Sequence, residues 1–527
     1  MWRRTPGPGR LRTSPVCLYR SCLNIVKTPN PLPEPCEIEL KLALPVSDPS
    51  GLAQRVSRTP LLARRKSTRT LLHNTYYDTP DQLLRQQGVA LRVRREGRAG
   101  KPQWLQTLKT AGASESALSI RGEWEFAIPS GDLSLEILRA NTPWARIDPD
   151  ARIFAALGPC FVTHFERTAW LVRRRDASAV EVALDLGQIE AGDKSAPLCE
   201  LELELLQGEP RALFEIAQQI AGKIPLLPLG QSKSERGYAL AKGTLDAPVR
   251  AAPARLRARM PVADAAHRVL REMFHQFTAN LHALRVSDDP EVVHQARVGW
   301  RRFRSAWRLF RPALDSGSTP DWDTLKPLMA FVGELRDLDV ARTETLPPFT
   351  EAYTAGDPRR TQDWQALFEA LAAAATLQRK SVRYALEDPA LGATLLQTAF
   401  WLERLPRQPA DNAPDASTPP LRQWAALRVG RMHQQLESAL EDDADSIPSQ
   451  HRIRIQAKRL RYAIEALRGV LPDKRSNRWL SQACGLQAAI GDSRDLGQAG
   501  VLAARVEADR GVVEFLRGLA AGRQRRP

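Results

Sequence analysis

The sequence predicts an α+β protein in which a strand-rich N-terminal half precedes an all-helical C-terminal half. Up to about residue 245, short runs of alternating apolar and polar residues are separated by Gly, Pro and Asp, which is typical of strands and turns. Beyond that point, apolar residues recur every three or four positions, which is typical of helices. One motif in the helical half occurs twice, which indicates an internal duplication.

The composition is that of a large globular protein and favours an anionic partner. A chain of 527 residues exceeds the usual size of one domain, so two or three domains are expected. Lys and Arg number 76 against 60 Asp and Glu, and the charge of +16 favours polyphosphate, nucleic acid or a membrane surface. No run of about 18 apolar residues is present, so no membrane span is expected. The six cysteines form no CxxC or zinc pattern, which favours free thiols in a reducing compartment.

Three stretches of biased composition indicate where the domains begin and end. Residues 1–35 are basic and contain Pro and Ser; we expect a disordered leader, with a transit peptide or an over-extended start as the alternatives. Residues 244–258 contain Ala, Pro and Arg and are the expected linker between a domain at 36–243 and a helical domain at 259–520. A stretch rich in Pro, Asp, Asn and Ser at 404–420 is expected to divide the helical domain in two.

The first expected strand, Glu37-Ile38-Glu39-Leu40-Lys41, places its charges on one face. Alternation puts two carboxylates and one ammonium on that face, with Ile38 and Leu40 on the other. Mixed charges on one strand face suit a wet cavity that holds a divalent cation and a polyanion. A surface strand with alternating charges is the commoner structure, so the later strands decide between the two.

Later segments repeat this alternation with complementary charges. Arg92 and Arg94 share a face, where two guanidinium groups suit bidentate contact with phosphate oxygens. Glu200, Glu202 and Glu204 share one face of one strand, and such like charges require cations nearby, from side chains or a metal. Further charged residues lie in alternating segments at Lys109, Arg121, Glu123, Glu125, Glu181 and Asp185. Together these residues favour a site for a metal-bound polyphosphate.

Residues 36–240 resemble a CYTH domain, that is, a triphosphate tunnel metalloenzyme. The matching motifs are the first strand described above, Asn74-Thr75-Tyr76-Tyr77-Asp78-Thr79-Pro80, Ala90-Leu91-Arg92-Val93-Arg94, Thr107-Leu108-Lys109, Ala183-Leu184-Asp185-Leu186-Gly187, Glu200 to Glu204, and Ser232-Lys233-Ser234-Glu235-Arg236-Gly237-Tyr238. The resemblance implies an antiparallel tunnel of about eight strands that holds a triphosphate and a divalent metal. Members with this architecture are similar to bacterial inorganic triphosphatases, whereas others act on thiamine triphosphate or cyclise ATP, so the substrate stays open.

The resemblance also assigns roles to the charged residues. Carboxylates are expected to hold one or two Mg²⁺ or Mn²⁺ ions, namely Glu37, Glu39, Asp185, Glu202 and Glu204. Basic side chains are expected to hold the phosphate oxygens, namely Arg92, Arg94, Lys109, Arg121, Arg167 and Lys233. Lys41, Glu37 and Glu39 form the expected catalytic set, in which Lys41 orients the leaving group or water. Glu200 is expected at the tunnel mouth, and the group that activates water stays open.

The helical half carries one motif twice. The segment from His294 to Arg304 recurs from His451 to Arg461, with a basic residue three, seven and ten positions after each histidine. Because an α-helix has 3.6 residues per turn, each set lies on one stripe. The two stripes are His294, Arg297, Arg301 and Arg304, and His451, Arg454, Lys458 and Arg461. A solvated basic face is the usual structure for one such helix, but its duplication favours binding of an anion.

The duplicated motifs resemble the CHAD family, the conserved histidine α-helical domain, over about residues 260–520. The resemblance implies two related helical bundles whose histidines and basic residues line a cavity that binds polyphosphate. Polyphosphate carries about one negative charge per phosphate, so its binding should release counterions and weaken as salt rises. A second repeated segment contains residues that we interpret as salt bridges between helices: Glu334, Arg336, Asp337, Asp492, Arg494 and Asp495.

These features favour a metal-dependent hydrolase that splits inorganic triphosphate into pyrophosphate and phosphate and carries a polyphosphate-binding helical domain. Two alternatives stay open: a polyphosphate-binding scaffold without turnover, and an enzyme that hydrolyses or cyclises an organic triphosphate. Nucleotide-binding and serine-hydrolase folds have no support, because the sequence contains no P-loop, GxGxxG context or GxSxG motif. We expect a cytoplasmic protein associated with polyphosphate granules, with no specific nucleic acid and no membrane partner; the oligomeric state stays open.

Overall fold

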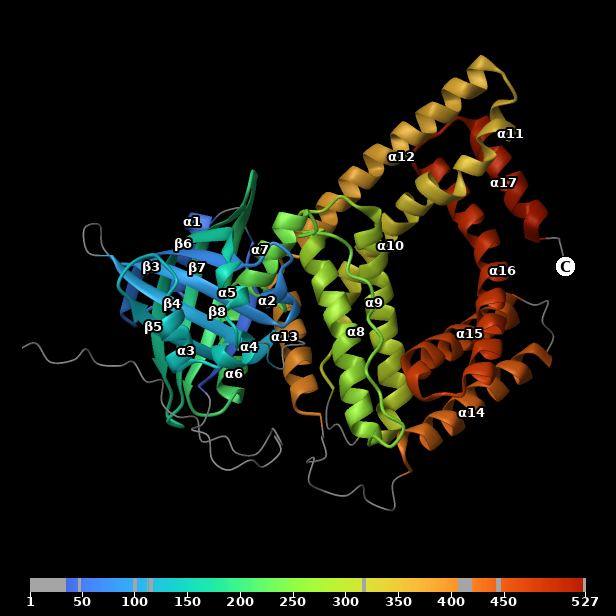
Figure 1. Ribbon diagram of the computed structural model, residues 1–527. Helices are drawn as coiled ribbons and strands as arrows, with labels where there is room; N and C mark the ends of the chain where they lie inside the picture. The colour runs from blue at the N-terminus through green and yellow to red at the C-terminus, as the bar shows by residue number, and fades with distance from the viewer. Residues whose placement is uncertain are drawn as a thin grey trace, which may run out of the picture. The chain divides into compact units, whose positions relative to one another are not determined.

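A computed structural model describes residues 35–45, 49–97, 102–110, 112, 117–314, 319–405, 419–441 and 447–524 (Figure 1). The chain divides into two compact units, Met1–Leu245 and Asp246–Pro527. The first unit is rich in strands and the second is helical, which confirms the predicted fold class. Nearly all of the predicted leader at 1–35 and most of the predicted break at 404–420 lie outside the described residues.

Eight antiparallel strands close into a barrel in the first unit, as predicted. They follow the order β5-β4-β3-β2-β6-β7-β8-β1, and β1 pairs with β5 to complete the circle. Closure leaves no long sheet edge exposed. The strands are β1 (Cys36–Ala43), β2 (Ser67–Asp78), β3 (Val89–Glu96), β4 (Gln103–Thr110), β5 (Leu118–Ile128), β6 (Gly158–Arg173), β7 (Ala179–Ala191) and β8 (Lys194–Gln207), and a short β9 (Leu227–Pro228) also pairs with β1.

Charged residues line much of the inner face of the barrel and apolar residues the outer face, but an apolar cluster that contains Tyr76 and Phe161 also lies inside one end. Along β1, Leu40 and Leu42 are fully buried on the outer face, while Glu39 and Lys41 occupy the inner face. Helices cover the outer face, and on β3, β4 and β5 they bury Trp144 in a cluster of apolar side chains. The covering helices are α1 (Pro49–Ser57), α2 (Leu83–Gln86), α3 (Leu135–Asn141), α4 (Trp144–Ile147), α5 (Arg152–Ala155) and α6 (Arg211–Ala221). A charged interior is therefore compatible with a stable fold, because much of the hydrophobic core lies around the barrel.

Helix α7 (Lys233–Lys242) packs against β6, β7 and β8 and joins an apolar cluster in the barrel. A capping box between Ser232 and Glu235 begins the helix, so its first residue is well defined. Tyr238 packs edge-on against Phe161 and donates a hydrogen bond to Asp78 Oδ2 at 2.7 Å. Only glycine fits at position 237, because a Cβ there would lie 2.2 Å from the Phe161 ring. The aromatic contacts and the hydrogen bond hold α7 in the barrel.

The second unit is helical throughout its described elements. Several helices begin with an Asp N-cap followed by Pro, the arrangement that satisfies the first backbone N–H groups at α9, α12 and α13. The helices are α8 (Val262–Leu284), α9 (Pro290–Phe310), α10 (Lys326–Val340), α11 (Thr350–Thr354), α12 (Pro358–Ala385), α13 (Pro389–Glu403), α14 (Leu421–Glu441), α15 (Ile447–Leu467), α16 (Asp473–Arg505) and α17 (Arg510–Gln524). Among the described residues, no helix combines the length and apolar character that crossing a membrane requires.

The repeated motifs lie on helices that contact one another. The first stripe is on α9 and the second on α15, and these two helices pack together. The second repeated segments are on α10 and α16, which are also in contact. The segment predicted as a linker is hydrogen-bonded to α8: Val249 N donates to Asn280 Oδ1 at 3.0 Å, and Asn280 Nδ2 donates back to Val249 O at 2.8 Å.

Candidate functional site

The strand register gathers the predicted residues of the first unit on one continuous inner surface. Residues directly opposite on neighbouring antiparallel strands point to the same face of a sheet. The register therefore links the charged residues strand by strand around the barrel. The opposed pairs are Lys41 and Glu202, Glu39 and Glu204, Glu37 and Arg121, Lys109 and Glu123, Thr107 and Arg92, Asn74 and Arg94, and Arg167 and Asp185.

One group of ion pairs forms where β1 meets β4 and β5. Arg121 Nε donates to Glu37 Oε2 at 2.9 Å, and Lys109 Nζ approaches the same oxygen at 2.8 Å. Burial alone would raise the pKa of Glu37, but Lys109 and Arg121 hold that pKa well below its usual range. Glu39, only 3% exposed, contacts both Lys41 and Arg121. The expected catalytic set of Lys41, Glu37 and Glu39 thus lies within a dense network of opposite charges.

The Arg92 and Arg94 guanidinium groups are held by polar side chains from three strands. Arg92 Nε donates to Thr107 Oγ1 at 3.3 Å, and Arg94 Nε donates to Asn74 Oδ1 at 3.0 Å. Glu125 Oε2 lies 3.3 Å from Arg94 Nη1 and accepts from Thr107 at 2.9 Å. These contacts fix both side chains inside the barrel. Sequence reasoning gave no role to Asn74 and Thr107, although both lie within motifs of the family resemblance.

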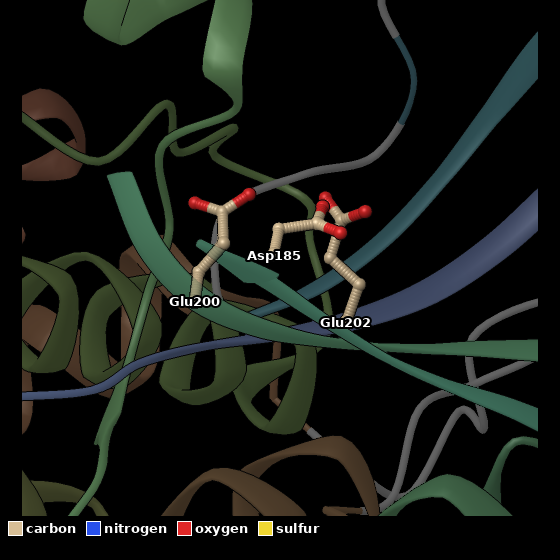
Figure 2. A group of neighbouring side chains, drawn as sticks. All are labelled: Asp185, Glu200 and Glu202. Carbon is tan, nitrogen blue, oxygen red and sulfur yellow. The ribbon is translucent and has the colours of Figure 1, made fainter. Parts of the chain in front are cut away.

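A second group contains three carboxylates: Asp185 on β7, with Glu200 and Glu202 on β8 (Figure 2). One oxygen of each lies within 4.8 Å of the others. Lys233, at the start of α7, bridges all three, with Nζ 2.7 Å from Asp185 Oδ2 and 2.9 Å from Glu202 Oε1. Burial alone would lower the pKa of Lys233, but the carboxylates raise it above its usual value, so the ammonium stays charged.

Arg167 closes this group from β6. Its Nε and Nη2 atoms donate to the two oxygens of Asp185 at 2.7 and 2.6 Å, a bidentate pair. The same Nη2 atom also contacts Glu202. Asp185 and Glu202 therefore both bind two cations, and both of those cations belong to the residues predicted to hold phosphate.

Glu200, expected at the tunnel mouth, is buried beneath α7. Its side chain is fully buried, with 0% exposure. It pairs across the sheet with Asp185, at the level of the barrel where α7 packs against β8. Arg236 of α7 donates to Glu200 Oε2 at 2.9 Å. Helix α7 covers this residue, and the sequence pattern of one strand does not show such a cover.

Glu204 differs from Glu37, Glu39, Asp185 and Glu202 because, among the described residues, no cation lies within ion-pair distance of it. Its cross-strand neighbours are Glu39 and Glu181, both acidic. Burial, together with the negative charges of Glu37 and Glu123, raises the pKa of Glu204 to about 8. A partly buried carboxylate among other carboxylates is suited to a bound cation. Neither Glu204 nor the pair Glu37 and Glu39 belongs to the close group in Figure 2.

In the second unit, basic side chains from α9, α15 and α16 surround Lys458. Burial and the positive charges of Arg454, Arg301 and Arg494 together lower the pKa of Lys458 to about 8. The Arg301 guanidinium also lies over the Tyr462 ring, 5.5 Å from its centroid. The two stripes therefore meet at Arg301, Arg454 and Lys458. Arg494 belongs to this basic cluster as well, although sequence reasoning interpreted it as part of a salt bridge.

The remaining residues of the two stripes differ in their surroundings. Arg297 Nη1 donates to Gly333 O at 2.8 Å and pairs with Asp337, whereas Arg461 pairs with Glu465 at 2.8 Å. Burial and the positive charge of Arg336 lower the pKa of His294. Two members of the stripes remain. Arg304 lies near Arg308, and the side chain of His451 is outside the described residues.

The predicted interhelical salt bridges form in part. Asp337 on α10 pairs with Arg297 on α9 at 3.3 Å, and Glu334 pairs with Arg505 on α16 at 3.7 Å. Arg336 pairs with Glu344, 2.8 Å away on the segment that follows α10. The side chain of Asp492 lies outside the described residues. These contacts tie the helices that carry the basic cluster to their neighbours.

Comparison with known proteins gives a family for each unit. The CYTH domain profile matches residues 36–238, and the CHAD domain profile matches residues 268–504. An inorganic triphosphatase from Haemophilus influenzae is 34% identical over 205 residues, which are 39% of this chain and 54% of the relative. The chain thus spans about half the length of the curated relative that it matches.

Solved structures resemble parts of the chain. The CHAD domain from the plant Ricinus communis is 28% identical, with a TM-score of 0.42, over 53% of this chain and 91% of that one. PptA from Streptomyces chartreusis is 20% identical, with a TM-score of 0.33, over 50% of this chain and 94% of its own. By the two profile matches, residues 36–238 form a CYTH domain and residues 268–504 form a CHAD domain.

Proposed function

We propose that the barrel hydrolyses inorganic triphosphate to pyrophosphate and phosphate in a metal-dependent reaction. The observation that carries this proposal is the inner surface, where carboxylates and basic side chains from many strands lie close together around the barrel. Phosphoryl transfer to water needs charge neutralisation and fixed geometry more than covalent participation by the protein. A surface that offers ligands for both a cation and a polyanion meets these needs, and similarity to an inorganic triphosphatase supports the assignment.

The carboxylates fit a divalent cation. Mg²⁺ and Mn²⁺ prefer oxygen ligands, and Asp185 and Glu202 have oxygens close enough to share one ion. Glu204, partly buried beside other acids, is suited to binding a metal cation. Glu37 and Glu39 are further candidate ligands on the same inner surface. A bound ion would neutralise charge on the phosphate oxygens.

The basic residues would exchange partners when the substrate enters. Without it, Lys233, Arg167 and Lys109 are paired with carboxylates. A triphosphate offers these cations new oxygen partners, and charge-assisted hydrogen bonds of the same strength can then form. The carboxylates released in this way become available to a cation. Arg92, Arg94 and Arg121 would hold the remaining oxygens, and Lys41 would orient the leaving group or water.

A binding protein without turnover is the weaker alternative. Carboxylates of low exposure such as Asp185 and Glu202 cost desolvation energy that a simple anion-binding site avoids. An enzyme that needs a cation has a reason to keep them. The experiment below distinguishes inorganic triphosphate from an organic triphosphate as the substrate.

The test is phosphate release by the full chain from triphosphate, ATP, thiamine triphosphate and long polyphosphate, each with Mg²⁺, Mn²⁺ or a chelator. We expect the highest kcat/KM with inorganic triphosphate and no activity with the chelator. A preference for ATP or thiamine triphosphate would reassign the substrate. Tight binding of triphosphate with no release under any condition would instead support the scaffold.

We further propose that the CHAD domain binds polyphosphate through the basic cluster around Lys458. Its cations come from separate helices, and burial together with positive neighbours lowers the pKa of Lys458. A polyanion would relieve this repulsion and release counterions. Such binding would bring the barrel to a polyphosphate store in the cytoplasm. Retention of the full chain on immobilised polyphosphate, lost as salt rises, would support the proposal.

A further inference from the structure

Three buried side chains form a chain of contacts at the end of the barrel that α7 covers. Lys233 contacts Glu200 Oε1, and Arg236, one turn later on α7, donates to Glu200 Oε2 at 2.9 Å. Arg236 Nη2 donates to the backbone oxygen of Pro197 at 3.0 Å. Lys233 and Arg236 are each 6% exposed, and Glu200 is 0% exposed. Successive polar contacts from Lys233 to Glu200, from Glu200 to Arg236 and from Arg236 to Pro197 therefore join α7 to β8.

Glu200 differs from the two carboxylates beside it in Figure 2. Among the residues that the structure describes, Asp185 and Glu202 form ion pairs with Arg167 and Lys233, and both cations are expected to turn toward a phosphate. Glu200 has an additional partner in Arg236, which a main-chain carbonyl anchors to the same strand. A guanidinium held at two points loses both hydrogen bonds if it moves. Glu200 is thus fixed by a partner that stays in place.

We propose that Arg236 and Glu200 are positioning residues that hold Lys233 toward the substrate, and that Glu200 is not a metal ligand. The proposal rests on the triphosphatase function proposed above. A lysine side chain has a flexible four-carbon stem, so the stem alone does not fix the position of the ammonium group. The fixed carboxylate of Glu200 contacts the ammonium of Lys233 and keeps it in place when Asp185 and Glu202 bind a metal cation instead. Misplacement of a group that contacts the substrate by about 1 Å can cost roughly 100-fold in rate.

The experiment uses the full chain and compares Arg236→Gln, Glu200→Gln, the double variant, and Asp185→Asn. Each is assayed for kcat and KM with triphosphate, for the Mn²⁺ concentration that gives half-maximal activity, and for the melting temperature. Arg174→Gln is the matched control, because Arg174 is a partly buried arginine paired with Glu215 of α6. Within the described part of the chain, the ion pairs of Arg174 are with Asp176 and Glu215 and not with residues of the inner surface.

We expect Arg236→Gln and Glu200→Gln to lower kcat/KM for triphosphate by at least about tenfold and to leave half-saturation by Mn²⁺ within about twofold. Asp185→Asn should raise that Mn²⁺ concentration by about tenfold or more. Arg236→Gln leaves a buried carboxylate without its fixed partner and should lower the melting temperature. The double variant should recover the melting temperature but not the rate, because Lys233 still lacks its support.

Two outcomes overturn the inference. If the double variant recovers the rate together with the stability, the pair is only structural. If Glu200→Gln shifts the Mn²⁺ dependence as strongly as Asp185→Asn, Glu200 is a ligand. Both are distinct from failure of the proposed function, in which the parent chain itself releases no phosphate from triphosphate.

Discussion

At the scale of single residues, Glu204 gives the clearest pH prediction. Its folded-state pKa of about 8 lies above the unfolded value, so the folded state holds a proton more tightly than the unfolded chain. The stability from that proton is complete below the unfolded pKa and is lost as the pH rises through 8. Without metal, Glu204→Gln should therefore melt higher than the parent at pH 8.5, by a margin that shrinks toward pH 5.

Melting curves in chelator at these two pH values, by circular dichroism, provide the measurement. Glu166→Gln is a suitable control, because Glu166 is an exposed acid on β6 with an ion pair at 4.0 Å. Equal margins for Glu204→Gln at pH 5 and pH 8.5 would contradict the environment described for this carboxylate.

A second residue-scale prediction concerns turnover. Glu202→Gln should remove most hydrolysis at saturating Mn²⁺, by roughly 100-fold or more, because a lost carboxylate ligand weakens charge neutralisation in the transition state. Glu202 also forms ion pairs with Lys233 and Arg167, so the variant removes one carboxylate partner from each of these two cations. Initial rates of phosphate release, with circular dichroism as the check on folding, test this. A rate near that of the parent would remove Glu202 from the proposed site.

Strand alternation was sufficient to place Glu37, Glu39 and Lys41 on one inner face. It could not give the pairing of Arg167 with Asp185, because register depends on contacts between distant strands. The burial of Glu200 and its bond to Arg236 were also beyond it, since both depend on where α7 packs. Roles drawn from a family resemblance therefore needed the tertiary structure before the positioning pair could be recognised.

At the scale of elements, α9 and α15 bring like charges together at a cost to stability. The folded-state pKa of Lys458, about 8, lies below its ordinary value, so folding disfavours the charged form. The resulting loss of stability is complete below pH 8 and disappears as the pH rises above the ordinary lysine pKa. Lys458→Gln should therefore raise the melting temperature at pH 7 and have little effect near pH 10.

The same variant should bind polyphosphate more weakly, so stability and binding are expected to move in opposite directions. Lys474→Gln, at the exposed start of α16, is the matched control and should change neither property. Thermal melts with and without long-chain polyphosphate measure both effects in one experiment. A fall in melting temperature for Lys458→Gln without ligand would show that its positive neighbours are already neutralised.

Removal of either basic stripe should weaken polyphosphate binding and reduce its salt dependence. Changing Arg297, Arg301 and Arg304 together to Gln should lower the slope of log affinity against log salt by roughly 2, at about 0.7 per lost contact. Changing Arg454, Lys458 and Arg461 should act alike, because each stripe has one arginine already paired with an acid, Arg297 with Asp337 and Arg461 with Glu465. Binding titrations across a salt series provide the slopes. If both triple variants match the parent, the stripes are solvated surface.

Helical periodicity predicted the two stripes, but not which of their members meet. Arg301, Arg454 and Lys458 lie together because α9 packs on α15, whereas Arg461 turns to an acid on its own helix. Arg494 joins the cluster from α16, and its motif alone suggested a salt bridge. Periodicity gives a face of one helix, and only the packing of several helices shows what that face contacts.

At the scale of the whole molecule, the barrel should work without the helical unit. Every residue proposed for hydrolysis lies before Leu245, which itself packs against the apolar cluster at α7. The barrel is closed, and its two apolar clusters contain only residues of the first unit. A fragment of residues 35–245 should therefore fold and retain kcat for triphosphate within about twofold. A fragment that stops at residue 229 lacks Lys233 and Arg236 and should be inactive. Circular dichroism and phosphate release distinguish the cases: a folded 35–245 fragment without activity would mean that the CHAD domain completes the site.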